Sequence, residues 1–138
     1  VNSRLDTIQA VILNVKLKYF EEEIDKRQKI AERYTSLLHD YFITPKIQND
    51  RTSVWAQYTI RVKNRDQLQE RLKGKGIPTA VHYPRPLHLQ EAFAFCGGKE
   101  GDFPVAEKIA GEVMSVPMSA YLTTIEQSYI CNELINLN

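Results

Sequence analysis

The sequence lacks three features that would assign it to a broad class at once. Its 18 basic and 17 acidic side chains leave a formal net charge of +1 over 138 residues, so no overall field favours nucleic acid or an anionic membrane surface. No stretch approaches the ~20 apolar residues that cross a bilayer, and no signal-peptide pattern opens the chain. We therefore expect a cytoplasmic protein with neither nucleic acid nor membrane as a partner.

Cysteine and histidine are too few and too badly spaced for a metal centre. The two cysteines, Cys96 and Cys131, form no C-x-x-C pair, which argues against a disulfide framework and a zinc site. We expect both to act as small apolar residues. His82 and His88 are separated by two prolines and match no common zinc spacing. No serine or cysteine stands in a recognisable nucleophile context, so we predict no metal site and no catalytic residue in this chain.

The first third of the chain has a helical pattern. Apolar residues recur at helical spacing over residues 6–38, with no glycine or proline to stop them. Ser3 and Asp6 stand in the relation of a capping box. More than thirty helical residues would extend ~50 Å, whereas a globule of this length is somewhat under 40 Å across. We therefore expect the helix to overhang, to bend, or to lean on protein outside this chain.

The rest of the chain predicts short strands between helices. Thr123 and Glu126 form a capping box for a last helix, and Pro104 occupies a favoured first-turn position. The predicted elements are strands at 54–62, 79–83 and 113–116 and helices from 64, from 90 to 95, from 104 and from 123. The fold class is thus α+β: one domain over residues 1–138, with a long N-terminal helix and a small three-stranded sheet covered by helices.

The stretch T-A-V-H-Y-P-R-P-L-H is unusual because a buried strand leads directly into polar chemistry. His82 and Tyr83 follow the strand, and Pro84 and Pro86 restrict the loop after it. The simplest interpretation of His82 is a histidine packed at a strand edge with one nitrogen satisfied; the alternative is a ligand contact. Arg4, near Asn2 at the start of the long helix, fits an anion site or an ordinary surface salt bridge.

Five stretches follow one another in a distinctive order along the chain: N-S-R-L-D-T-I-Q-A (2–10), W-A-Q-Y-T-I-R-V (55–62), G-I-P-T-A-V-H-Y-P-R-P-L-H (76–88), F-P-V-A-E (103–107) and M-S-V-P-M (114–118). Together they resemble the C-terminal part of the DegT/DnrJ/StrS sugar aminotransferases, which are pyridoxal-phosphate enzymes of fold type I. The resemblance covers nearly the whole chain in order. Its V-H-Y-P-x-P-L form is most similar to the branch that acts on UDP-2-acetamido-2-deoxy-3-keto sugar acids with glutamate as amino donor.

The resemblance implies a division of labour between this chain and a large N-terminal domain. In such enzymes that domain carries the Schiff-base lysine and most of the cofactor phosphate ligands, and none of the ten lysines here follows the family's lysine motif. The chain opens on Val1 rather than methionine, which leaves two alternatives: this end is a cut, or the domain is encoded separately. Pyridoxal phosphate is expected in the complete enzyme and not on this chain alone.

The resemblance also implies which residues reach the active site of the neighbouring subunit in a dimer. Asn2 is expected to contact the cofactor phosphate. Arg4, His82 and Tyr83 are expected to contact a nucleotide-sugar substrate, in an enzyme that serves the biosynthesis of surface polysaccharide or related sugars.

Two further expectations remain open at this point. The alternative function is a free-standing α+β regulatory or interaction module without catalysis, which would bind an effector at the strand ends. If a large domain normally covers the long helix, its apolar stripe, including Val11, Val15, Tyr19 and Phe20, is expected to be left exposed in this chain. Such patches mark interfaces, so we expect a homodimer or self-association.

Overall fold

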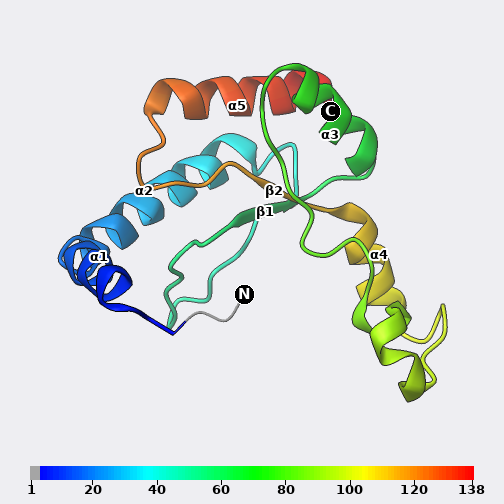
Figure 1. Ribbon diagram of the computed structural model, residues 1–138. Helices are drawn as coiled ribbons and strands as arrows, with labels where there is room; N and C mark the ends of the chain where they lie inside the picture. Colours follow the sequence, from blue (N-terminus) through cyan, green and yellow to red (C-terminus); the bar gives the residue numbers. More distant parts are fainter. Residues whose placement is uncertain (1–3) are drawn as a thin grey trace.

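Three helices gather against a small antiparallel sheet in the computed structural model, which describes residues 4–138. The helices are α2 (Phe20–Leu38), α3 (Arg65–Gly74) and α5 (Thr124–Leu137), and α5 contacts both of the others. Figure 1 shows α5 above α2, with the sheet strands β1 (Tyr58–Arg61) and β2 (Val113–Val116) beneath them. The expected arrangement of helices over a small sheet is therefore confirmed, in a structure that is rich in helix.

The predicted continuous N-terminal helix is wrong, because the chain forms two helices there. Helix α1 (Thr7–Leu17) ends before α2 begins at Phe20. At the break, the backbone N–H of Lys18 donates to Val15 at 3.2 Å and that of Tyr19 to Lys16 at 3.0 Å. These bonds reach back three residues instead of four, which is the tighter 3₁₀ pattern. With neither glycine nor proline at the break, the sequence carried no signal for it.

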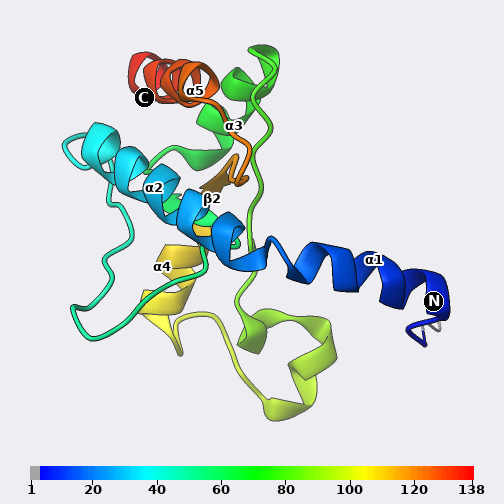
Figure 2. The same ribbon diagram turned by 90° about the vertical axis from the view of Figure 1, so that its left-hand side faces the viewer.

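Helix α1 projects away from the rest of the molecule, as Figure 2 shows. Asp6 caps it by accepting a hydrogen bond from the backbone N–H of Gln9 at 2.9 Å, whereas Ser3, the predicted cap, lies outside the described residues. None of the residues of α1 is buried. The expected overhang is confirmed. Isolated helices this short are marginal in water, so helical propensity alone does not explain an eleven-residue helix with no buried face.

The sheet has two strands within the described residues, so the third predicted strand is also wrong. Strand β1 pairs antiparallel with β2, and Thr59 lies opposite Ser115. Segment 79–83 meets β2 only through an isolated bridge between Ala80 and Ser115. Pro78 and Pro84 flank this segment and have no N–H to donate, which limits its pairing with β2.

Between the bridge at Ala80 and strand β2 the chain makes a long excursion away from the core. It contains two short 3₁₀ helices, η1 (Leu87–Leu89) and η2 (Glu91–Cys96), and returns through α4 (Pro104–Glu112). Helix α4 has its proline in the first turn, as predicted. Cys96, at the end of η2, is exposed. Both cysteines were expected to act as small apolar residues; Cys131 is buried, as that role requires, whereas Cys96 is exposed.

The core lies between α2, α5 and the sheet, and its buried polar groups are paired. Tyr34 and Tyr58 are fully buried and their rings stack at a centroid distance of 5.0 Å. The hydroxyl of Tyr34 donates to the carbonyl of Pro117 at 2.9 Å, and that of Tyr58 lies 2.7 Å from the Thr35 hydroxyl. These bonds offset the desolvation of two phenols.

Helix α5 is fixed at its start and along its length. Its capping box forms as predicted: the backbone N–H of Thr123 donates to Glu126, and the N–H of Glu126 donates to the Thr123 hydroxyl. The buried Gln127 donates to the carbonyl of Ile30 at 2.7 Å and accepts from Arg33 at 3.2 Å. No helix in the described residues combines the length and apolarity needed to cross a bilayer.

Candidate functional site

The segment that leads to His82 is held at the outer edge of β2 by a few specific contacts. The backbone N–H of Ala80 donates to the carbonyl of Ser115 at 3.1 Å, and that of Ser115 donates to Ala80 at 2.7 Å. One residue earlier, the hydroxyl of Thr79 accepts from the side-chain amide of Gln69 at 2.9 Å. The chain thus leaves the sheet just before His82 with its direction fixed.

His82 and Tyr83 are exposed side chains with no hydrogen-bond partner among residues 4–138. Their rings meet edge to face at a centroid distance of 5.7 Å, and the peptide bond that joins them is cis. Tyr83 keeps 72% of its surface accessible. The interpretation of His82 as a packed histidine with a satisfied nitrogen therefore does not hold. Both side chains have their polar atoms free for a ligand.

A hollow of about 280 Å³ lies beside His82. Its walls come from three of the sequence stretches that carry the family resemblance, although these stretches are far apart along the chain. The residues that line it are Ala56, Gln57, Pro78, Thr79, Ala80, His82, Ser115, Val116, Pro117 and Met118. The predicted site residues did not include Gln57, Ser115 or Met118. These three lie in stretches that carry the family resemblance, which was the only sign in the sequence that they belong to the site.

Trp55 fixes the segment that brings Ala56 and Gln57 into this hollow. Its backbone has a φ of +48°, a left-handed conformation that is rare and costly for a residue with a large side chain. The side chain is buried, its indole N–H donates to Gln28 at 2.6 Å, and its ring packs against Tyr58 at a centroid distance of 5.6 Å. Burial of the indole and this hydrogen bond hold the strained turn in place.

The second histidine of the T-A-V-H-Y-P-R-P-L-H stretch, His88, has a different role, since it is built into the excursion. The Nε2 atom of His88 lies 2.9 Å from a carboxylate oxygen of Glu107, and its ring packs on Phe103. The same carboxylate accepts backbone hydrogen bonds from Gly101 and Phe103. The bond from Gly101, with those from His88 and Phe103, lowers the pKa of Glu107. This cluster fastens the returning end of the excursion to α4.

The structure does not bring Arg4 to the hollow. Arg4 precedes α1, whose N-terminal end points away from the sheet in Figure 2. Its side chain is exposed and forms no ion pair with a described residue, so the alternative of a surface salt bridge within this part of the chain does not apply. Asn2, predicted to contact the cofactor phosphate, lies outside the described residues.

The lysines of the chain do not fit the covalent attachment of pyridoxal phosphate. All ten are described and none is buried, whereas an amine that forms a Schiff base must be partly neutral and is usually desolvated. Lys26 is the least exposed, and its hydrogen bond to Glu22 raises its pKa, away from the neutral form. Within residues 4–138, no group of three or more His, Cys, Asp or Glu side chains is arranged to hold a metal ion.

The fold and these motif segments match one protein family. The sequence profile of the DegT/DnrJ/EryC1/StrS aminotransferase family matches residues 1–135. The chain therefore belongs to that family.

Three curated relatives show how the chain compares with proteins of this family. It is 50% identical over 137 residues to a UDP-2-acetamido-2-deoxy-3-oxo-D-glucuronate aminotransferase of Pseudomonas aeruginosa, covering 99% of this chain and 37% of the relative. It is 47% identical to a pleiotropic regulatory protein of Geobacillus stearothermophilus (96% and 37%). It is 38% identical to a dTDP-3-amino-3,6-dideoxy-alpha-D-galactopyranose transaminase of Aneurinibacillus thermoaerophilus (91% and 34%). The chain thus spans little more than a third of these relatives.

Solved structures agree with the sequence comparison. A DegT/DnrJ/EryC1/StrS aminotransferase from Brucella abortus superposes with a TM-score of 0.89 at 40% identity, over 97% of this chain and 36% of that one. DesV of S. venezuelae, in complex with a ketimine intermediate, superposes with a TM-score of 0.91 at 33% identity, over 99% of this chain and 37% of that one. NtdA of Bacillus subtilis, with bound cofactor PMP, superposes with a TM-score of 0.80 at 27% identity, over 99% of this chain and 33% of that one.

Proposed function

We propose that this chain is the small C-terminal domain of a pyridoxal-phosphate-dependent aminotransferase that aminates a nucleotide-linked ketosugar, with glutamate as amino donor. The complete enzyme would serve surface polysaccharide or related sugar biosynthesis. Family membership, the sugar substrates in the names of two relatives and the cofactor in NtdA support this proposal. The large cofactor-binding domain would lie outside the 138 residues, because no lysine here suits the cofactor.

One observation carries the proposal. Three distant stretches that resemble the family converge on a single hollow lined by His82, and His82 and its neighbour Tyr83 are exposed with no hydrogen-bond partner among residues 4–138. The hollow of about 280 Å³ is too small to enclose a nucleotide sugar, since drug-sized ligands occupy roughly 300–1,000 Å³. A surface this shallow suits a domain that contributes part of a site and disfavours a free-standing binding module.

The roles of the individual residues follow from their chemistry. His82 and Tyr83 would hydrogen-bond oxygens of the sugar or its phosphates, and Pro84 and Pro86 would limit the movement of the loop that carries them. Arg4 would offer a forked donor to a carboxylate or phosphate. Because Arg4 does not line the hollow beside His82 within one chain, we infer that the two residues serve different copies of the site in a homodimer.

A chimeric enzyme tests this function. The matching segment of the Pseudomonas aeruginosa relative, which is 50% identical, would be replaced by this chain, and glutamate-dependent amination of the UDP-sugar would be measured. We expect activity in the chimera and none in the relative's remaining part alone. A folded, dimeric chimera without activity would overturn the proposal.

Variants of the chimera test the residue roles. Arg4→Ala and His82→Ala should each reduce kcat/KM by roughly ten- to a hundredfold, since a charge-assisted hydrogen bond contributes about 1.5–3 kcal/mol. Lys99→Gln, an exposed change away from the hollow, serves as control and should leave kcat/KM unchanged. Tight binding of the sugar nucleotide by the isolated chain would instead support the regulatory module.

A further inference from the structure

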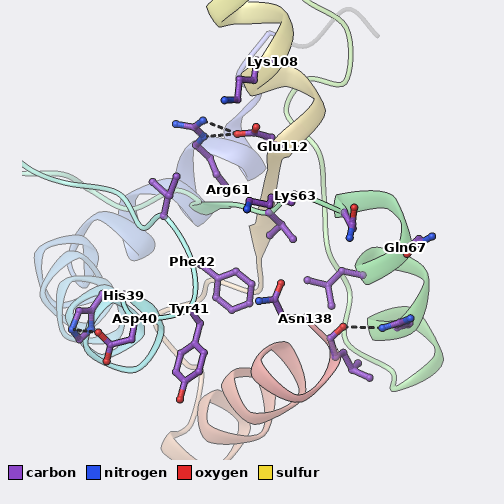
Figure 3. Close-up of a pocket in the computed structure, with 16 residues that line it drawn as sticks. His39, Asp40, Tyr41, Phe42, Arg61, Lys63, Gln67, Lys108, Glu112 and Asn138 are labelled. Carbon is purple, nitrogen blue, oxygen red and sulfur yellow. Dashed lines mark hydrogen bonds and ion pairs between the residues drawn. The ribbon is translucent and has the colours of Figure 1, made fainter.

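A second and larger cleft lies where the end of β1, the end of α2 and helices α3 and α4 meet (Figure 3). Its volume of about 660 Å³ falls within the roughly 300–1,000 Å³ typical of small-molecule sites. Phe42 and Leu68 are buried side chains that form an apolar floor. None of the residues that line it belongs to the hollow beside His82.

One end of the cleft gathers more positive charge than its acid neutralises. Arg61 donates from Nε and Nη2 to the same carboxylate oxygen of Glu112, at 3.0 and 2.6 Å. Lys63 and Lys108 line the same end, and Figure 3 shows Lys108 extending toward the Arg61 guanidinium. Neither lysine has an ion pair with a described residue. Three cations against one carboxylate leave a surplus of two positive charges.

The remaining charged side chains of the cleft leave this surplus unchanged. Asp40 adds one negative charge, since its partner His39, 3.2 Å away, is charged only when protonated, and Figure 3 places this pair at a distance from Lys108. Arg71 adds one positive charge, because its guanidinium donates to the uncharged backbone carbonyl of Leu137 at 3.0 Å. These two charges cancel over the cleft as a whole, so the surplus of two remains.

We propose that this cleft binds a small phosphate-bearing molecule. A dianionic phosphate matches the surplus of two charges, and lysine and arginine are the side chains that favour it. The phosphate lies among Arg61, Lys63 and Lys108, and an apolar or ring-shaped body covers the floor of Phe42 and Leu68. Asn64 and Gln67 also line the cleft. Their side-chain amides would hydrogen-bond polar groups of that body.

Titration of the ¹⁵N-labelled chain with phenyl phosphate, followed by amide chemical shifts, tests the site. We expect saturable shifts confined to the amides around the cleft, weakened by added salt because the contacts are ionic. Inorganic phosphate should bind more weakly, since it lacks the body, and phenol should give no saturable shift. Absence of saturation with phenyl phosphate, or equal binding of phenol, would overturn the proposal. Inorganic phosphate binding as tightly as phenyl phosphate would overturn the role of the apolar floor.

A matched pair of double variants separates this site from general attraction of anions. The double substitution Lys63→Gln with Lys108→Gln should weaken the binding of phenyl phosphate by roughly tenfold or more, because two charge-assisted contacts are lost. Lys29→Gln with Lys99→Gln removes the same charge from exposed positions outside the cleft and should leave the affinity unchanged. All four lysines are exposed, so both proteins should fold. Equal weakening in the two proteins would overturn the proposal.

Discussion

Gly98 lies against His88 so closely that a Cβ on Gly98 would stand 2.9 Å from the Cβ of His88 and 3.0 Å from its carbonyl oxygen. Contacts under 3.0 Å force a displacement, and here the neighbours are a Cβ and backbone atoms, which cannot swing aside. The absence of a side chain at position 98 therefore allows the excursion to close over His88, whose ring is held by Glu107.

Gly98→Ala should destabilise the protein by about 1–3 kcal/mol, as for overpacking at other crowded positions. Gly111→Ala is the matched control, because nothing lies within 4 Å of a Cβ at that position in α4. The control should be neutral or stabilise by about 0.4–1 kcal/mol, since alanine reduces the entropy of the unfolded chain. Urea unfolding measures both, and equal stabilities would contradict the crowding of Gly98.

Acid should loosen the attachment of the excursion to α4. The hydrogen bond from Gly101, with those from His88 and Phe103, lowers the pKa of Glu107 in the folded state. A carboxyl with a lowered folded pKa contributes stability that is fully present above its unfolded pKa, about 4.3, and is lost as the pH falls through the folded value.

The Gly101 amide shift and its hydrogen exchange between pH 6 and pH 3 report this change locally. In Glu107→Gln the acid-dependent step at Gly101 should be absent, because the amide does not titrate. The step would have another origin if both proteins showed it equally.

Truncation of Leu134 tests the packing of α5 on the core. Leu134 is fully buried, and Leu134→Ala should cost about 2–5 kcal/mol through lost burial and the cavity left behind. Ile125, on the same helix, is 83% exposed, so Ile125→Ala should change the free energy of unfolding by no more than about 0.5 kcal/mol. Similar costs for the two substitutions in chemical denaturation would show that α5 is not docked as described.

The two thiols should differ in reactivity. Cys96 is exposed, whereas burial raises the pKa of the Cys131 thiol to about 11. Because the thiolate is the reacting form, a disulfide reagent at pH 8 should modify one thiol quickly and the other only as the protein unfolds. Cys96→Ser should remove the fast phase. Two fast thiols in the folded protein would contradict the burial of Cys131.

The exposed apolar surface of α1 and of the residues Tyr19 and Phe20 that follow it should drive association of the isolated chain. Val11, Val15, Tyr19 and Phe20 each keep more than half of their surface accessible, as predicted, and apolar patches of this kind mark interfaces. We expect light scattering to show a mass above the monomer's 15.9 kDa. Val11→Lys with Val15→Lys should shift the chain toward monomer, while Ile125→Lys on α5 should not. A monomer at high concentration would contradict this surface as an interface.

Local chemistry made several elements predictable. Thr123 and Glu126 form their capping box, Pro104 opens α4, and strand 113–116 has the predicted bounds. The capping box and the first-turn proline depend on contacts within a few residues, so the sequence carries their complete signal. The strand was marked by a short apolar run that Pro117 ends, although its partner strand β1 lies far away in the sequence. The His82 and Tyr83 pair was likewise marked by its motif, and its exposure agrees with a contact to substrate, which remains a proposal.

The sequence by itself thus determined the capping box of α5, most helices and the family. Only the tertiary structure decided that the long helix breaks before Phe20, that segment 79–83 pairs at one residue alone, and that Gln57 and Met118 lie beside His82. The physical reason is range. A cap or a helical stripe depends on contacts between residues three or four positions apart. Strand pairing and the walls of a hollow depend on segments more than twenty residues apart, which meet only when the core has formed.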